Sequence, residues 1–179
     1  ANDFILPYPD LLLLSDSSGR FSDASANIDD QNNGNGKICG FSHDASTGDF
    51  DNDGDYDVFA CNLLLVNDGL GNFVIHQDLD FNLQQAYGNP MSSLIVDLNN
   101  DDYADLVFWN FDNRPNSIYE EGFALVSDGT ANVDDWTLVA LPEGPFGRNH
   151  NKFNHAAWGD LNNDGNNDVV VGITRDLPY

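Results

Sequence analysis

Short apolar runs alternate with Asp-rich and Gly-rich stretches along the chain, and this pattern predicts β-strands joined by tight loops. The apolar runs are three or four residues long, as at 58–60, 63–66, 106–109, 123–126 and 169–171. Runs of this length between turn-forming residues are typical of strands, because a helix needs a longer amphipathic stretch to bury one face. Helical periodicity is weak throughout. We therefore predict an all-β fold.

Three Asp-rich segments align with one another without gaps. They read GDFDNDGDYD (48–57), VDLNNDDYAD (96–105) and GDLNNDGNND (159–168). Their first aspartates stand at positions 49, 97 and 160, which are 48 and then 63 residues apart. One of the apolar runs follows each segment directly. Self-similarity at such a spacing indicates a repeat architecture.

A second repeated unit interleaves with the first. It reads LLLLSDSSGRF (11–21), LLLVNDGLGNF (63–73) and FALVSDGTANV (123–133). Each copy is an apolar run, a turn rich in Asp, Gly or Ser, and the start of another strand. This order predicts a β-hairpin, because Asp-Gly supplies the positive φ that hairpin turns need.

Together the two units predict four short antiparallel strands per repeat, which is the order and length of a β-propeller blade. We predict a single partial propeller over residues 1–179, with the last hairpin of a blade at 10–24, whole blades at 40–80 and 89–140, and the first hairpin of another at 151–175. Two half blades and two whole ones cannot close a usual ring. We therefore expect a fragment of a longer chain or a subunit that closes against another chain. A β-sandwich with three coincidentally similar loops is the alternative fold.

The Asp-rich segments predict calcium sites, because alternate residues of a tight nine-residue loop can turn their oxygens inward and Ca²⁺ takes six to eight oxygen ligands. Gly54 at loop position 6 permits the sharp turn, whereas Asp102 replaces glycine in the second loop and predicts a weaker site. The predicted ligands, at positions 1, 3, 5, 7 (through the carbonyl) and 9, are Asp49, Asp51, Asp53, Asp55 and Asp57; Asp97, Asn99, Asp101, Tyr103 and Asp105; and Asp160, Asn162, Asp164, Asn166 and Asp168.

Two other interpretations of these loops compete with a nine-residue calcium loop. An EF-hand shares the opening Asp-x-Asp-x-Asp-Gly but needs a bidentate Glu at position 12 and flanking helices. Position 12 holds Ala60, Phe108 and Val171 here, and the flanks are rich in strand residues. Acidic surface turns without any metal are the second interpretation. Three aligned copies favour calcium, with about three structural ions.

Charge excludes several partners. The chain carries 30 Asp plus Glu against 6 Lys plus Arg, a formal net charge of −24, and 27 of the acids are Asp. Such a surface cannot neutralise phosphates, so we expect neither nucleic acid nor anionic membrane as a partner. No apolar run reaches the 18 residues typical of a membrane-spanning helix. A hydrophobic content of 41% with 12 Phe is still enough for a packed core.

The loops and hairpins resemble the FG-GAP and VCBS repeats of integrin α-subunit propellers and of many secreted microbial proteins. The resemblance covers about residues 10–173 and is closest at ASTGDFD (45–51) and AAWGDLN (156–162), whereas LIVD (94–97) lacks the glycine before the loop. It implies a seven-bladed ring, calcium between the first two strands of each blade, and export, but no particular ligand. We therefore expect a secreted or cell-surface module that binds a protein or glycan in adhesion or scaffolding.

Catalytic motifs are lacking. The four histidines are not paired with Ser or Cys in any known pattern, and the chain has no phosphate-binding loop and no His-Glu-x-x-His. We expect no enzyme activity, with an accessory domain of a secreted hydrolase or lyase as the alternative.

Candidate ligand contacts are the aromatic residues and two connecting segments, 114–121 and 142–152, which are otherwise ordinary solvated loops. Trp109 and Trp158 are expected to belong to the core. Cys39 and Cys61 form one disulfide or remain two buried thiols. The aromatic candidates for stacking on sugars are Trp109, Trp136, Trp158, Tyr87 and Tyr119.

Overall fold

The computed structural model describes residues 11–29, 44–60, 63–76, 90–110, 122–130, 135–142 and 152–174. These residues form strands and turns, with one short 3-10 helix, η1 (Ser25–Asn27), and no α-helix. The predicted all-β class is confirmed. No helix of the described ranges is long and apolar enough to cross a membrane. The expectations for both cysteines, Tyr87, Tyr119, segment 114–121 and most of 142–152 lie outside the described residues.

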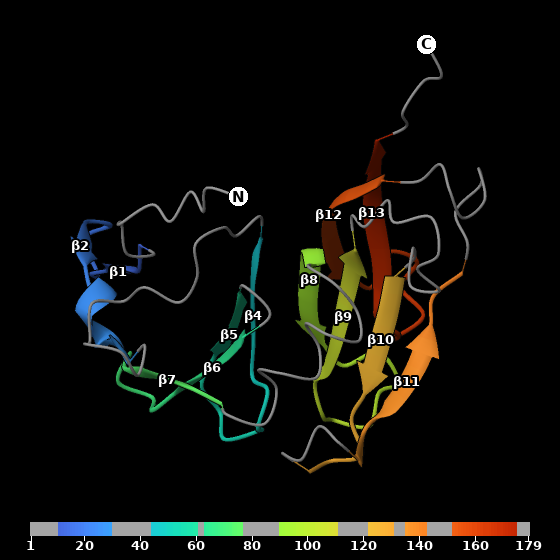
Figure 1. The fold of residues 1–179 in the computed structure, drawn as a ribbon, viewed down its shortest axis with the longest axis horizontal. Helices are drawn as coiled ribbons and strands as arrows, with labels where there is room; N and C mark the ends of the chain where they lie inside the picture. The colour runs from blue at the N-terminus through green and yellow to red at the C-terminus, as the bar shows by residue number, and fades with distance from the viewer. Residues whose placement is uncertain are drawn as a thin grey trace, which may run out of the picture.

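The strands form four sheets in sequence order (Figure 1). Two of these sheets are hairpins, β1 (Leu13–Ser15) with β2 (Phe21–Asp23), and β12 (Lys152–Gly159) with β13 (Asp168–Thr174). Between them lies a sheet of β4 (Ala45–Gly48), β5 (Asp57–Ala60), β6 (Leu63–Asn67) and β7 (Phe73–Ile75), extended by β3 (Ile28–Asp29) parallel to β7. The other large sheet holds β8 (Pro90–Val96), β9 (Asp105–Asn110), β10 (Gly122–Val126) and β11 (Thr137–Ala140). None of these sheets closes on itself.

We name the large sheets sheet A (β4–β7 with β3) and sheet B (β8–β11). In each, four consecutive strands pair antiparallel with their sequence neighbours. Sheet A lies within the range 40–80 apart from β3, and sheet B lies within 89–140. The Asp-rich loops join the first two strands of sheet A, of sheet B and of the β12–β13 hairpin. The flanks of every loop are therefore strands, not the helices of an EF-hand.

Among the described residues, the buried apolar side chains other than Ala60 and Leu63 fall into three clusters, and each cluster lies between two successive sheets. Strand β9 shows why: Leu106 and Phe108 belong to the cluster shared with sheet A, whereas Val107 and Trp109 belong to the cluster shared with the β12–β13 hairpin. Successive side chains of a strand point to opposite faces, so a strand that is apolar throughout buries both of its faces. This explains why β9 reads as an uninterrupted apolar run.

The first strands of successive units pack against one another, because β8 contacts both β4 and β12. Gly48 at the end of β4 is required there, since a Cβ at this position would lie 2.5 Å from Cγ2 of Ile95. The corresponding residue of sheet B is Val96, which is buried in a cluster whose neighbouring members include the small Ala156. The second copy therefore holds a larger, buried side chain where sheet A has glycine.

The tryptophans differ from the expectation at one position. Trp109 and Trp136 are buried, and Trp136 stacks on Phe50 of sheet A with ring centroids 4.9 Å apart. Trp158 was expected in the core but is 49% exposed. It lies on β12, and in the described part of the chain the β12–β13 hairpin packs against sheet B alone.

Candidate metal centre

The three Asp-rich loops, named loop one (49–57), loop two (97–105) and loop three (160–168), fold in the same way. In each, the two carboxylate oxygens of the position-1 aspartate accept hydrogen bonds from the backbone N–H groups of positions 5 and 6. The donor–acceptor distances are 3.1 and 3.1 Å for Asp49, 3.3 and 3.1 Å for Asp97, and 3.1 and 2.9 Å for Asp160. The first aspartate therefore holds the turn closed in all three loops.

Each turn also depends on two residues with positive φ. Position 6 has φ of 98° at Gly54, 88° at Gly165 and 71° at Asp102, so Asp102 adopts the conformation that glycine has in the other loops. Position 4 is an asparagine in every loop, with φ between 59° and 61°. Asparagine is enriched in the left-handed region, so the three position-4 asparagines are themselves a sequence signal for this conformation. The position-4 residues are Asn52, Asn100 and Asn163.

The position-9 aspartates do more than the sequence predicts. Asp57 is fully buried, and its carboxylate accepts the N–H of Phe50 at 2.8 Å and that of Asn67 at 2.9 Å. Asp105, also fully buried, accepts the N–H groups of Leu98 and Ser127, both at 2.8 Å. These carboxylates join the start of the loop to the end of the third strand. Nothing in the loop motif itself indicates this second partner.

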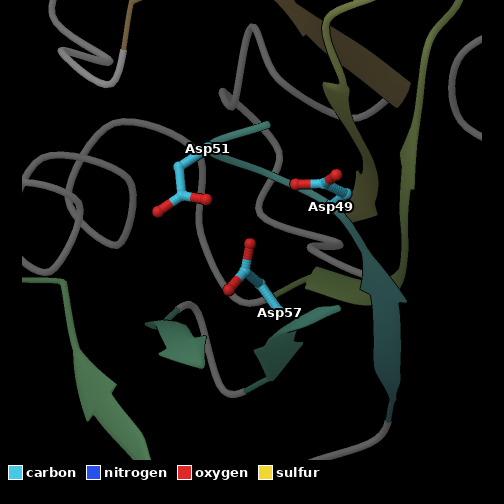
Figure 2. Close-up of side chains that lie close together, drawn as sticks. All are labelled: Asp49, Asp51 and Asp57. Carbon is cyan, nitrogen blue, oxygen red and sulfur yellow. The ribbon is translucent and has the colours of Figure 1, made fainter. Parts of the chain in front are cut away.

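Three of the predicted ligands of loop one come together. One carboxylate oxygen from each of Asp49, Asp51 and Asp57 lies within 4.8 Å of the other two, and Figure 2 shows the three side chains turned toward a common space. Asp53 instead accepts the N–H of Asp55 at 3.1 Å, and a carboxylate oxygen of Asp55 lies near Gly69 in the β6–β7 turn. The predicted contribution of Asp55 was its carbonyl, so its side chain is not needed at the site.

Loops two and three differ from loop one at position 3, where Asn replaces Asp. The Asn99 amide donates to Asp101 at 2.9 Å, and the Asn162 amide donates to Asp164 at 3.0 Å. Each amide therefore cancels part of the repulsion that loop one carries between positions 3 and 5. Among the described residues the trio of loop one has no acidic equivalent in the other loops.

The pKa shifts of loop one reflect burial first and uncompensated negative charge second. Burial raises the pKa of Asp51, and the charge of Asp53 raises it further. The pKa of Asp55 is raised by burial and then by the charges of Asp53, Asp51, Asp49 and Asp68. In loop three, by contrast, hydrogen bonds from Asn166 and Asn162 lower the pKa of Asp164. A cation among the loop-one carboxylates would remove the repulsion that disfavours their ionised forms.

The donor set fits a hard cation. Every predicted ligand is a carboxylate, amide or carbonyl oxygen, and these are the ligands that Ca²⁺ prefers, whereas transition metals favour imidazole and thiolate. Asp49, Asp51 and Asp57 would hold the ion in loop one, and the same positions of the other loops would hold theirs. Such an ion would fix the turn and neutralise charge.

Comparison of the chain with known protein families found no matching family, and no curated protein matched it.

Proposed function

We propose that this chain is a calcium-binding, propeller-type repeat module that acts outside the cell by binding a protein or glycan, and that calcium is structural in it. The millimolar calcium concentration outside cells suits loops that bind calcium weakly through short side chains. The bound ion converts binding free energy into folding free energy, because the unfolded chain has no preformed site. We assign no catalytic role to the chain.

The observation that carries this proposal is the common geometry of the three loops. Each loop closes on its position-1 carboxylate, and in loop one three carboxylates converge despite their mutual repulsion. Three turns that merely covered a surface would have no reason to share this arrangement. Among the described residues, the half-exposed Trp158 is the best candidate for a contact with a sugar, because one face of an indole can stack on a sugar ring.

Calcium titration calorimetry tests the proposal. We expect about three ions to bind per chain, and the double substitution Asp49→Asn with Asp51→Asn to remove one of them. Asp16→Asn is the matched control, because Asp16 is also a turn aspartate that accepts backbone N–H groups, from Ser18 and Arg20, but lies in no loop of the nine-residue type. An unchanged stoichiometry in the double variant would contradict the assignment of loop one.

A second candidate function, assembly with another chain, is favoured by the exposure of the two hairpins. Leu63 and Leu65 of β6 are buried, whereas Leu11 and Leu13, at the matching repeat positions of the first hairpin, are exposed. Likewise Phe59 of β5 is buried, but the matching Val170 of β13 is 54% exposed. Under this proposal, the hairpins of a second copy cover these apolar residues and complete the half sheets.

Sedimentation velocity tests assembly. We expect species of at least twice the 19.7 kDa of one chain in calcium and moderate salt, which screens the charge of −24. Val170→Asp should return the protein to the monomer. Leu70→Asp is the control, because Leu70 is exposed at the β6–β7 turn of a complete sheet and should leave the mass unchanged. A monomeric wild-type chain would rule the assembly out.

A further inference from the structure

Loops two and three lie against each other and share hydrogen bonds. The side-chain amide of Asn100 in loop two donates to the carbonyl oxygen of Gly165 at 3.0 Å and to Oδ1 of Asn166 at 2.8 Å, both in loop three. In the other direction, the amide of Asn167 in loop three donates to the carbonyl oxygen of Asp97 at 2.6 Å. Three hydrogen bonds therefore join two loops that are more than 60 residues apart in sequence.

These hydrogen bonds connect predicted ligands of the two loops. On one side, the Asp97 carboxylate accepts the backbone N–H of Asn100 at 2.7 Å. On the other side, Asn166 donates its own amide and its backbone N–H to the carboxylate of Asp164, both at 2.8 Å. A continuous path thus runs from Asp97 through Asn100 and Asn166 to Asp164.

Loop one stands outside this network. Among the described residues, the hydrogen bonds of loop one stay inside sheet A. The loop closes on the carboxylates of Asp49 and Asp57, and its hydrogen-bond partner beyond the loop is Asn67 at the end of β6. The three loops are therefore not equivalent, although their sequences align without gaps. Two of them are connected, and the third is independent.

We propose that loops two and three form one cooperative two-ion unit, and that loop one binds its ion independently. The inference rests on the proposed calcium binding and adds how the sites depend on one another. The first ion orders its own loop and, through Asn100, Asn166 and Asn167, also the other loop. The second ion then binds a loop whose ordering cost has been met, which gives positive cooperativity. Repulsion between the two ions acts in the opposite direction but is screened at physiological salt.

The coupling has a reciprocal signature. Disabling loop three with Asp160→Asn and Asp164→Asn should weaken calcium binding at loop two about tenfold, and disabling loop two with Asp97→Asn and Asp101→Asn should weaken loop three by the same factor, since coupling between two sites is reciprocal. Disabling loop one with Asp49→Asn and Asp51→Asn should leave both affinities unchanged. The proposal would be contradicted if disabling loop two and disabling loop three changed the other loop's affinity by different factors. It would also be contradicted if disabling loop one weakened loops two and three to the same extent.

A single substitution isolates the hydrogen bonds from the ligands. Asn100→Gly removes the connecting amide, and glycine readily adopts the φ of 59° found there. Asn163→Gly is the matched control, because Asn163 occupies the same position of loop three at φ 61° and takes no part in the inter-loop bonds.

Calcium calorimetry on the full chain reads out both variants. We expect wild-type protein and Asn163→Gly to show one independent site and a pair with a Hill coefficient above 1, and Asn100→Gly to show three independent sites. Asn167→Ala should act like Asn100→Gly. Three independent sites in the wild type would overturn the coupling and leave calcium binding intact, whereas no binding at all would overturn both.

Discussion

Removal of calcium is expected to lower the melting temperature of this protein by roughly 15–30 °C. An ion present at 100 times its Kd stabilises the folded state by about 2.7 kcal/mol per site, so three sites contribute about 8 kcal/mol. Each 1 kcal/mol shifts the melting temperature of a chain of this size by about 2–4 °C. Since domains are stable by only about 5–15 kcal/mol, the loss approaches the whole stability of the fold.

Circular dichroism with and without a calcium chelator measures this effect. The physical reason lies in loop one, where Asp49, Asp51 and Asp57 converge and their repulsion returns once the ion is removed. Magnesium is the control, because it prefers octahedral geometry and keeps several of its waters, so it should restore only part of the stability. A melting temperature unchanged by chelation would mean that calcium is not structural here.

The second large effect is expected at the buried position-9 aspartates. Asp105→Ala leaves the N–H groups of Leu98 and Ser127 without their acceptor in a buried environment. An unsatisfied buried donor costs about 1–3 kcal/mol, so for two donors we expect a loss of about 2–6 kcal/mol in the free energy of unfolding. Urea denaturation at saturating calcium measures it, and Asp105→Asn, which keeps one acceptor oxygen, should lose less.

Asp168→Ala separates this structural role from metal binding. Asp168 holds the same loop position and is an equally good predicted ligand, but it accepts the N–H of Leu161 at an exposed site and is only partly buried. Asp168→Ala should therefore remove the calcium ion of loop three and lower the free energy of unfolding by little more than the contribution of that ion. If Asp105→Ala and Asp168→Ala destabilise the protein equally, the buried hydrogen bonds of Asp105 contribute nothing beyond the metal.

Much of the fold could be predicted from the sequence, because several strands are buried on both faces. The apolar runs 58–60, 106–109 and 169–171 all lie inside β5, β9 and β13. The first strands of each unit were harder to predict. They carry small polar residues where they meet. The hydroxyl groups of Ser46 on β4 and Ser93 on β8, for example, form a hydrogen bond of 3.0 Å, and strands that approach this closely have no room for large side chains at that point.

The site could be predicted in part. Its loop positions follow from the Asp spacing, because alternate residues of a tight loop share one side. The second partners of Asp57 and Asp105, at Asn67 and Ser127, could not be predicted, since they depend on how the third strand ends beside the loop. The hydrogen bonds from Asn100 to loop three could not be predicted either, because they depend on how two sheets pack.

The three separate apolar clusters have a consequence for how such a chain can change over evolutionary time. Each cluster is shared by two neighbouring sheets and by no others, so the molecule resembles a stack in which free energy is a sum over adjacent pairs. Duplication or deletion of one unit then requires only that the new neighbours match across one shared cluster, like the cluster that holds Ile95 or the cluster that holds Val96. Lineages of this architecture can therefore vary in length without redesign of a common centre.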